Sequence, residues 1–321
     1  MVVDNNKSIV LDLSECAALG DLICATPTIK KLSEFYNTEI IVVSGMPELF
    51  KHNPHVAGSY KHTSVDMNYL KNNCIYHNSF HNVGKKNEFG VELKHNRMDI
   101  RQFHAINLGF MLTPDEMQCY YSPTYTNRFI FPEKYVVIHP VQSWATRTWD
   151  AKNWMLLTQK LNEKGIYVVS IGKDSSEKGF FNVQKPVFNF EIEHGMNLMN
   201  QTNISDCWHI LNNAECVITM DSGILHLAGT TDVNIIQLGS HINPLFRAPY
   251  RLGRQDYKYK YVAGSCNIMC GSDCKYGVEE WGNIQGIPPL IKCLEKKPTF
   301  ECHPEVDEVV KSVSMFGRKC Y

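Results

Sequence analysis

Short apolar runs, each followed by polar turn residues and then by a segment of helical periodicity, recur along this chain. Such runs are typical of buried strands in a parallel sheet, and apolar residues three or four positions apart are typical of the helices that cover it. The predicted strands are residues 8–13, 39–43, 135–139, 166–171, 216–219 and 233–238. The predicted helices are residues 20–36, 153–164, 203–212 and 304–315. This alternation predicts an α/β fold with parallel sheets.

Individual residues refine the ends of these elements. Gly165 directly follows the second predicted helix, and glycine commonly ends a helix. Ser205 is the expected cap of the third. Pro27 lies inside the first, so the first turn of that helix is expected to be irregular. Residues 52–95 are rich in Asn, His and Lys with weak periodicity, and we expect loops and short elements around a site there.

The predicted elements fall into two series, one on each side of residues 123–132, which we interpret as a linker between two Rossmann-like halves with a cleft between them. A length of 321 residues fits two domains, which we place at residues 1–130 and 131–303, with a closing helix over 304–321. A dinucleotide-dependent oxidoreductase has a similar outline but carries Gly-x-Gly-x-x-Gly after its first strand. Neither half carries that pattern, and the first turn reads Glu-Cys-Ala-Ala-Leu-Gly over residues 15–20.

Composition argues against several classes of protein. With 44% hydrophobic and 20% charged residues, the chain can bury a sizeable core and is not expected to be disordered. Its 32 basic and 33 acidic residues leave a formal charge of −1, so no global field marks a nucleic-acid or membrane-surface binder. The N-terminus lacks the basic start and apolar stretch of a signal peptide, and no apolar run approaches the roughly 20 residues that span a membrane. We therefore expect a cytoplasmic protein.

The polar residues that follow the predicted strand 216–219 are the strongest candidates for a binding site. They include Asp221, Ser222, Gly223 and His226, and a short helix is expected to begin among them. Free backbone N–H groups at the carboxyl ends of parallel strands bind anions and nucleotides in open α/β sheets. The alternative is an ordinary turn in which Ser222 or Asp221 only caps the helix.

Three segments together resemble a known enzyme family. They are Leu-Gly-Asp-Leu-Ile-Cys-Ala-Thr-Pro (19–27), His-Pro-Val-Gln-Ser-Trp-Ala-Thr-Arg-Thr-Trp (139–149) and Asp-Ser-Gly-x-x-His-Leu-Ala (221–228). In this order and at this spacing they resemble the heptosyltransferase-like glycosyltransferases of family 9, most strongly over residues 135–250. The resemblance implies a GT-B fold, in which two Rossmann-like domains face a central cleft. The first domain then lies on the acceptor side, and the second binds the nucleotide-sugar.

The reaction that the resemblance implies is an inverting transfer of a heptose or related sugar from a nucleotide-diphospho-sugar to a hydroxyl of a glycan or protein. The acceptor hydroxyl must lose a proton as it attacks, and the resemblance makes Asp21, in an intact Gly-Asp-x4-Thr-Pro pattern, the general base. The alternative is a capping or first-turn acid that stabilises the helix that follows.

The leaving diphosphate must be stabilised as its negative charge grows. Arg147 matches the basic residue that contacts the donor phosphates in the family, and a guanidinium can hold a diphosphate through two parallel hydrogen bonds. The alternative is a surface arginine stacked on Trp144 or Trp149. The other donor-binding residues that the resemblance implies are Ser143, Thr146, Met220, Asp221, Ser222, Gly223 and His226. For His226 the alternative is a histidine packed within its helix.

Metal chemistry enters through the cysteines, because six of the twelve are scattered over the first 265 residues and six crowd the last 56. No Asp-x-Asp pair offers carboxylates to a catalytic Mg²⁺, so we expect no catalytic cofactor. Related protein-modifying heptosyltransferases carry a four-cysteine iron site near the C-terminus, and the resemblance implies a structural Fe or Zn site in the segment 266–302. Its ligands are Cys270, Cys274, Cys293 and Cys302, with Cys266 able to replace any of them. The alternative is a set of reduced, partly buried thiols.

Three other functions stay open at this stage. The same fold can use a GDP- or UDP-sugar, or the chain can be a non-catalytic nucleotide-sugar-binding or scaffold protein with a structural metal site. A nucleic-acid-binding zinc module is disfavoured by the near-neutral charge. The Lys-, His- and Asn-rich residues 51–104 suit an acidic glycan or peptide acceptor, or are simply a solvated basic surface.

Overall fold

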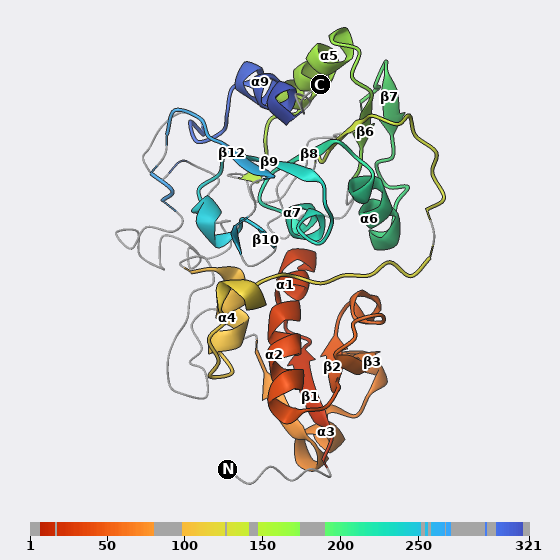
Figure 1. Ribbon diagram of the computed structural model, residues 1–321, viewed down its shortest axis with the longest axis vertical. Coiled ribbons are helices and arrows are strands. Elements are labelled where there is room, and N and C mark those ends of the chain that lie inside the picture. The colour runs from red at the N-terminus through yellow and green to blue at the C-terminus, as the bar shows by residue number, and fades with distance from the viewer. Residues whose placement is uncertain are drawn as a thin grey trace. The chain divides into compact units, whose positions relative to one another are not determined.

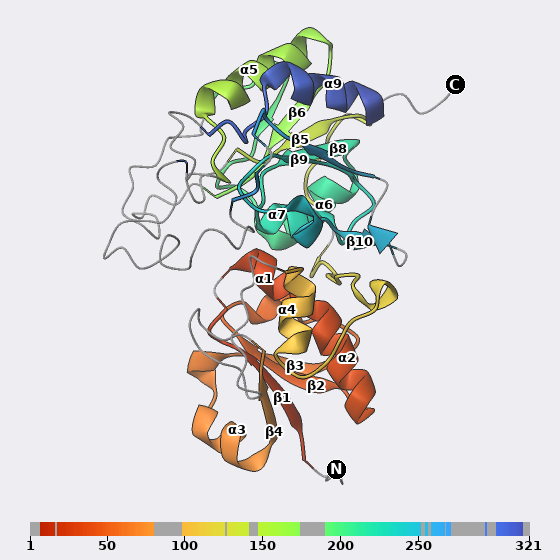
Figure 2. The same cartoon turned by 90° about the vertical axis from the view of Figure 1, so that its left-hand side faces the viewer.

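The computed structural model confirms an α/β fold built on parallel sheets (Figure 1; Figure 2). It describes residues 7–16, 18–79, 98–125, 127–140, 147–173, 190–251, 254–255, 258–266, 268–270, 293 and 300–316. The chain forms two compact units. Unit 1 consists of Met1–Thr124 and Ala248–Asp256, and unit 2 of Tyr125–Arg247 and Tyr257–Tyr321. In the part of the chain that the structure describes, no helix has the length and apolar character needed to span a membrane.

Unit 1 is built on a 4-stranded parallel sheet in the order β3-β2-β1-β4. Its strands are β1 (Ile9–Leu13), β2 (Ile40–Ser44), β3 (Val56–Lys61) and β4 (Ile75–Asn78). Its helices are α1 (Leu19–Cys24), α2 (Thr26–Tyr36), α3 (Met67–Asn73) and α4 (Ile100–Ile106), with 3₁₀ turns η1 (Pro47–Leu49), η2 (His62–Ser64) and η3 (Pro114–Glu116). The central strand β1 is buried along its whole length, as an almost uninterrupted apolar run predicts.

The single helix predicted over residues 20–36 is two helices, α1 and α2, that meet at Ala25. Pro27 is the physical reason, because it lacks a backbone N–H and is tolerated only where a helix begins. It occupies the first turn of α2. Thr26 Oγ1 donates to Ile23 O at 2.7 Å and ties the two helices together at the break.

In the described part of residues 52–95 the structure has short elements, as expected, and two of them are strands of the unit 1 sheet. Residues 56–61 and 75–78 are the edge strands β3 and β4, and α3 lies between them. None of the residues in these two strands is fully buried. Edge strands bury less apolar surface than central ones, and their mixed polarity concealed them from a search for apolar runs.

Unit 2 contains a 6-stranded parallel sheet in the order β12-β9-β8-β5-β6-β7. Its strands are β5 (Val136–Ile138), β6 (Val168–Ser170), β7 (Gly195–Asn197), β8 (Cys216–Thr219), β9 (Asn234–Leu238) and β12 (Tyr259–Val262). The chain begins at β5, adds β6 and β7 on one side, and then returns to add β8, β9 and β12 on the other. This is the order of the doubly wound nucleotide-binding fold, whose direction reverses between β5 and β8.

Helices cover both faces of this sheet. They are α5 (Ala151–Glu163), α6 (Ile204–Asn212), α7 (Gly223–Ala228) and α9 (Val306–Phe316), and a 3₁₀ turn, η5 (Pro244–Phe246), follows β9. Figure 1 and Figure 2 both show α5 beside α9 on one face and α6 beside α7 on the other. Trp149 and Trp154 pack edge to face with ring centroids 5.0 Å apart in the core under α5. Trp149 Nε1 also donates to Pro304 O at 3.1 Å, which fixes the start of α9.

Two expectations at the ends of helices have different outcomes. Gly165 ends α5 with a φ of +75°, as predicted. Ser205, predicted to cap α6, instead lies inside the helix. The cap is Asn203, whose side chain accepts from Asp206 N while the Asp206 carboxylate accepts from Asn203 N, each at 3.0 Å. This reciprocal capping box satisfies two backbone donors at once, which a single serine does not.

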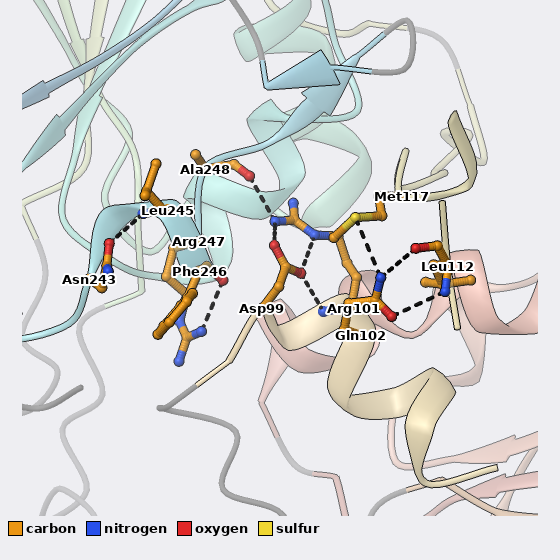
Figure 3. Close-up of polar contacts among 10 residues, drawn as sticks. All are labelled: Asp99, Arg101, Gln102, Leu112, Met117, Asn243, Leu245, Phe246, Arg247 and Ala248. Carbon is orange, nitrogen blue, oxygen red and sulfur yellow. Dashed lines mark hydrogen bonds and ion pairs between the residues drawn. The ribbon is translucent and has the colours of Figure 1, made fainter. Parts of the chain in front are cut away.

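A buried arginine holds the last part of unit 1 in place (Figure 3). Arg101 on α4 is 1% exposed and donates from Nε to Asp99 Oδ1 at 2.8 Å and from Nη2 to Asp99 Oδ2 at 2.5 Å. Its Nη2 also donates to Ala248 O at 2.8 Å, and the guanidinium lies 4.8 Å from the centroid of the Tyr250 ring. These contacts attach the segment that carries the hairpin strands β10 (Tyr250–Arg251) and β11 (Arg254–Gln255) to unit 1.

Replacing Arg101 by methionine is expected to lower the free energy of unfolding by about 3 kcal/mol, because it removes the charge partner of the Asp99 carboxylate and the donor to Ala248 O, and leaves Asp99 only its bond from the backbone N–H of residue 101. Urea unfolding at pH 7 measures the change. Lys30→Met is the matched control, because Lys30 pairs with Glu34 on the surface of α2, where an ion pair contributes less than about 0.5 kcal/mol. Equal effects of the two changes would contradict the anchoring role of Arg101.

Candidate functional site

The candidate site of unit 2 lies where its strand order reverses. Strands β5 and β8 are parallel neighbours with Ile138 opposite Ile218, so their carboxyl ends meet at one edge of the sheet. His139 follows β5 and donates its backbone N–H to Ile218 O at 3.1 Å. The predicted donor residues that follow β8 directly are Met220, Asp221, Ser222 and Gly223. A reversal point of this kind is where open α/β sheets bind ligands.

Asp221 is the electrostatic centre of this edge. Its side chain is 3% exposed, and Oδ2 lies 3.5 Å from Arg147 Nη1 and 3.6 Å from Arg247 Nε. Arg147 Nη1 also donates to Asp221 O at 3.3 Å. Burial alone raises the pKa of a carboxyl group, but the two guanidinium groups outweigh that effect and hold the pKa of Asp221 below its ordinary value. Asp221 is therefore a carboxylate at neutral pH and gathers both arginines at the end of β8.

Two members of this cluster, Arg247 and His241, were missed by the sequence analysis. Arg247 is buried, and its Nη1 donates to Phe246 O at 3.0 Å, next to the turn in which Asn243 Oδ1 accepts from Leu245 N (Figure 3). His241 is buried too, and this burial, assisted by nearby Arg147, lowers its pKa to about 3. Both residues follow β9, the strand next to β8. That adjacency is the signal that points to them, because neighbouring parallel strands end at the same edge.

The remaining predicted residues of the donor loop have distinct positions. His226 is buried on α7, and its proximity helps to lower the pKa of Asp221. Met220 packs into the hydrophobic core of unit 2. Ser143 and Thr146 lie outside the described residues. The structure thus brings Arg147 and His226 to Asp221, and their contact with a donor stays a prediction.

Ser222 does not cap the helix that it precedes. It occupies the N-cap position of α7 with extended backbone, but its side chain makes no capping hydrogen bond to that helix. Its hydroxyl instead lies 3.0 Å from Thr219 Oγ1 and 3.3 Å from His139 Nδ1. The alternative of a mere helix cap is therefore wrong for Ser222.

Asp21 lies in unit 1, on the helix that follows the central strand β1. It is the third residue of α1 and is half-buried, and the N-cap position belongs to Ala18. A carboxylate in the first turn of a helix stabilises that helix through its dipole. Asp21 therefore stabilises α1 whether or not it is also the general base. Burial and the nearby charge of Asp21 raise the pKa of Cys16. Asp21 thus follows the carboxyl end of a central parallel strand, as Asp221 does in unit 2.

Four cysteines of the C-terminal segment are described, Cys266, Cys270, Cys293 and Cys302, and backbone hydrogen bonds pair the segments that carry Cys266 and Cys302. Gly264 N donates to Cys302 O and Cys266 N to Glu301 O, each at 3.0 Å. The approach is close enough that a Cβ on Gly264 would lie 2.1 Å from Glu301 O. Burial, assisted by the neighbouring thiols of Cys270, Cys266 and Cys293, raises the pKa of Cys302 to about 12.

The described residues contain no group of three or more His, Cys, Asp or Glu arranged to hold a metal ion. Cys274, the fourth predicted ligand, lies outside them. Cys302 nevertheless lies against the candidate donor edge, because a Cβ on Gly239, directly after β9, would lie 2.1 Å from Cys302 O.

Comparison with solved structures confirms the GT-B class of fold. The dodecameric iron-containing heptosyltransferase TibC of enterotoxigenic E. coli H10407, in complex with ADP-D-β-D-heptose, is 14% identical, with a TM-score of 0.73 over 99% of this chain and 78% of TibC. A family 9 glycosyltransferase from Veillonella parvula DSM 2008 is 12% identical, with a TM-score of 0.64 over 97% of each chain. The ADP-heptose LPS heptosyltransferase II of E. coli is 13% identical, with a TM-score of 0.61 over 97% of this chain and 98% of that enzyme.

No curated protein sequence matches the chain. The sequence model of Glycosyltransferase family 9 (heptosyltransferase) matches residues 84–258, which include Arg147, Asp221, His226 and Arg247. The matched residues make up more than half of the chain's 321 residues. This chain therefore belongs to glycosyltransferase family 9, the heptosyltransferase family, and is a glycosyltransferase.

Proposed function

We propose that the chain transfers a heptose from ADP-heptose to a hydroxyl of a glycan or protein, with inversion at the anomeric carbon. The observation that carries the proposal is the pair of arginines around buried Asp221 at the reversal point of the sheet in unit 2. The complex of TibC with ADP-D-β-D-heptose supports this choice of nucleotide-sugar. A GDP- or UDP-sugar is the competing donor.

Arg147 and Arg247 are proposed to hold the diphosphate. Each guanidinium has five N–H donors in a planar fork that matches phosphate oxygens, and it keeps its charge at any physiological pH. Both contacts to Asp221 Oδ2, at 3.5 and 3.6 Å, are longer than a tight charge-assisted hydrogen bond of about 2.8 Å. Asp221 thus positions the two arginines without holding them tightly. As the bond from the anomeric carbon to the diphosphate breaks, their charges stabilise the leaving group.

Asp21 is proposed to be the general base. Its carboxylate accepts the proton of the acceptor hydroxyl while that oxygen forms a bond to the anomeric carbon and the diphosphate departs from the opposite face. Unlike buried Asp221, it is half-buried and follows the central strand β1, where a carboxylate keeps access to substrate.

Asp21→Asn is expected to lower kcat about 10³-fold and to leave the Kd for ADP-heptose within about 2-fold, because an amide cannot take the proton but keeps the size of the side chain. Transfer assays and calorimetry measure the two effects. Asp66→Asn is the matched control, since Asp66 caps α3 in the same unit and asparagine caps equally well. Retention of more than a tenth of the activity in Asp21→Asn would leave Asp21 with only its helix-stabilising role.

Arg147→Met and Arg247→Met are each expected to weaken ADP-heptose binding about 10- to 100-fold, because each removes charge-assisted hydrogen bonds to phosphate. Lys152→Met, on the exposed side of α5, is the control for loss of one positive charge in unit 2.

A thermal-shift screen with ADP, GDP, UDP and CDP sugars tests the choice of nucleotide base. If only a GDP- or UDP-sugar raised the melting temperature, that sugar and not ADP-heptose would be the donor. If no nucleotide-sugar raised it, a non-catalytic scaffold would be favoured.

We also propose a structural iron or zinc site in the cysteine segment, with Cys270, Cys274, Cys293 and Cys302 as ligands and Cys266 as the substitute. The backbone hydrogen bonds that join Gly264 to Cys302 and Cys266 to Glu301 support it, because they bring two of the cysteines onto paired segments, and thiolates are the preferred donors for both metals. TibC is iron-containing. The metal would fasten this segment to unit 2.

Metal analysis of the purified protein is expected to give about one iron or zinc ion per chain, and Cys302→Ser to remove it and lower the melting temperature, because one thiolate of a tetrahedral set is lost. Cys74→Ser in unit 1 is the control and should retain the metal. A wild-type protein without bound iron or zinc would instead indicate reduced, unligated thiols.

A further inference from the structure

Three polar side chains form a triangle of contacts at the reversal point of the sheet. His139 Nδ1 lies 3.1 Å from Thr219 Oγ1 and 3.3 Å from Ser222 Oγ, and the two hydroxyl oxygens lie 3.0 Å apart. His139 and Thr219 are buried, and Ser222 is half-buried at the edge where the donor is proposed to bind. The triangle therefore joins the ends of β5 and β8 to the donor loop.

The hydrogens of this triangle can be assigned from the contacts. Thr219 has one hydroxyl hydrogen, and of its three contacts only Met220 O, at 3.1 Å, must accept, whereas Ser222 Oγ and His139 Nδ1 can each donate. We assign the hydrogen to Met220 O. Thr219 Oγ1 can then only accept at its contact with His139, so His139 Nδ1 must carry the hydrogen. Burial lowers the pKa of His139 to about 3, so the ring is neutral at pH 7 and has this one N–H.

This assignment determines what Ser222 can do. The Nδ1–H of His139 faces both hydroxyl oxygens, so Ser222 Oγ can accept from it. The hydroxyl hydrogen of Ser222 can then be donated either to Thr219 Oγ1 or to a ligand. When it turns toward a ligand, Thr219 Oγ1 keeps its bond from His139, and no buried acceptor loses a partner.

We propose that His139 is a positioning residue, which holds Ser222 as a hydrogen-bond donor to an anionic oxygen of the nucleotide-sugar. A phosphate oxygen has no hydrogen to give, so the site must supply one, and a histidine with its hydrogen on Nδ1 leaves the Ser222 hydrogen for that purpose. The inference rests on the proposed function for the identity of the ligand. It adds His139, directly after β5, as a residue that does not touch the substrate and acts through Ser222.

The test is a double-mutant cycle on the Kd for ADP-heptose, measured by calorimetry. Ser222→Ala and His139→Leu are each expected to weaken binding about 10-fold, and the double variant no further, because both remove the same hydrogen bond. His139→Asn offers an amide N–H near the position of Nδ1 and is expected to stay within about 3-fold of wild type. His209→Leu, on α6, is the control for loss of an imidazole elsewhere in unit 2.

Two outcomes overturn the positioning role alone. One is a wild-type protein that binds ADP-heptose while the losses from His139→Leu and Ser222→Ala multiply. The other is a His139→Asn variant that binds as weakly as His139→Leu although its melting temperature equals that of wild type. A wild-type protein that binds no nucleotide-sugar overturns the proposed function together with this inference.

A second measurement is independent of the ligand. Nitrogen chemical shifts of the His139 ring in the free protein are expected to show a protonated Nδ1 and an unprotonated Nε2, unchanged between pH 5 and pH 8, because the charged form is disfavoured by burial. A hydrogen on Nε2, or titration within that range, would contradict the assignment.

Discussion

A carboxylate buried at the end of a strand needs positive charge around it, and the architecture of unit 2 meets that need at Asp221. Desolvating an isolated carboxylate is costly enough that the group would otherwise take up a proton. Arg147 and Arg247 keep the Asp221 carboxylate ionised. Arg147 precedes α5 in the chain, and Arg247 follows η5. The residues between them therefore fold back on the same point, and the connections after β5, β8 and β9 become parts of one site.

Strand order explains why these connections can meet. Because the sheet of unit 2 grows first to one side of β5 and then to the other, the loops after β5 and β8 leave in opposite directions. Polar side chains can occupy that edge without being covered by a crossover helix. Unit 1 has the same kind of order around β1, and Asp21 lies on the helix that follows β1. Both proposed functional carboxylates thus follow central strands rather than edge strands.

The sequence predicted those parts of the fold and site that depend on residues close together in the chain. Apolar runs identified the central strands, and the Asp221 loop was found because it directly follows one of them. Edge strands β3 and β4 were missed because half-exposed strands need no apolar run. Arg247 and His241 were missed because they reach Asp221 through the pairing of β8 with β9, which no local pattern encodes. His139 was quoted only as part of a motif, since its contact with Ser222 spans 83 residues.

The segment Ala248–Asp256 has a consequence for how the protein is made. It completes unit 1, although the chain must first build most of unit 2 to reach it. The buried guanidinium of Arg101 meets its backbone partner 147 residues later. On the ribosome, a nascent chain that ends between α4 and Ala248 has the strands of the unit 1 sheet, but Arg101 on α4 still lacks its backbone partner Ala248. The amino-terminal unit is therefore the first to begin folding, but it cannot be completed until most of unit 2 has been synthesised.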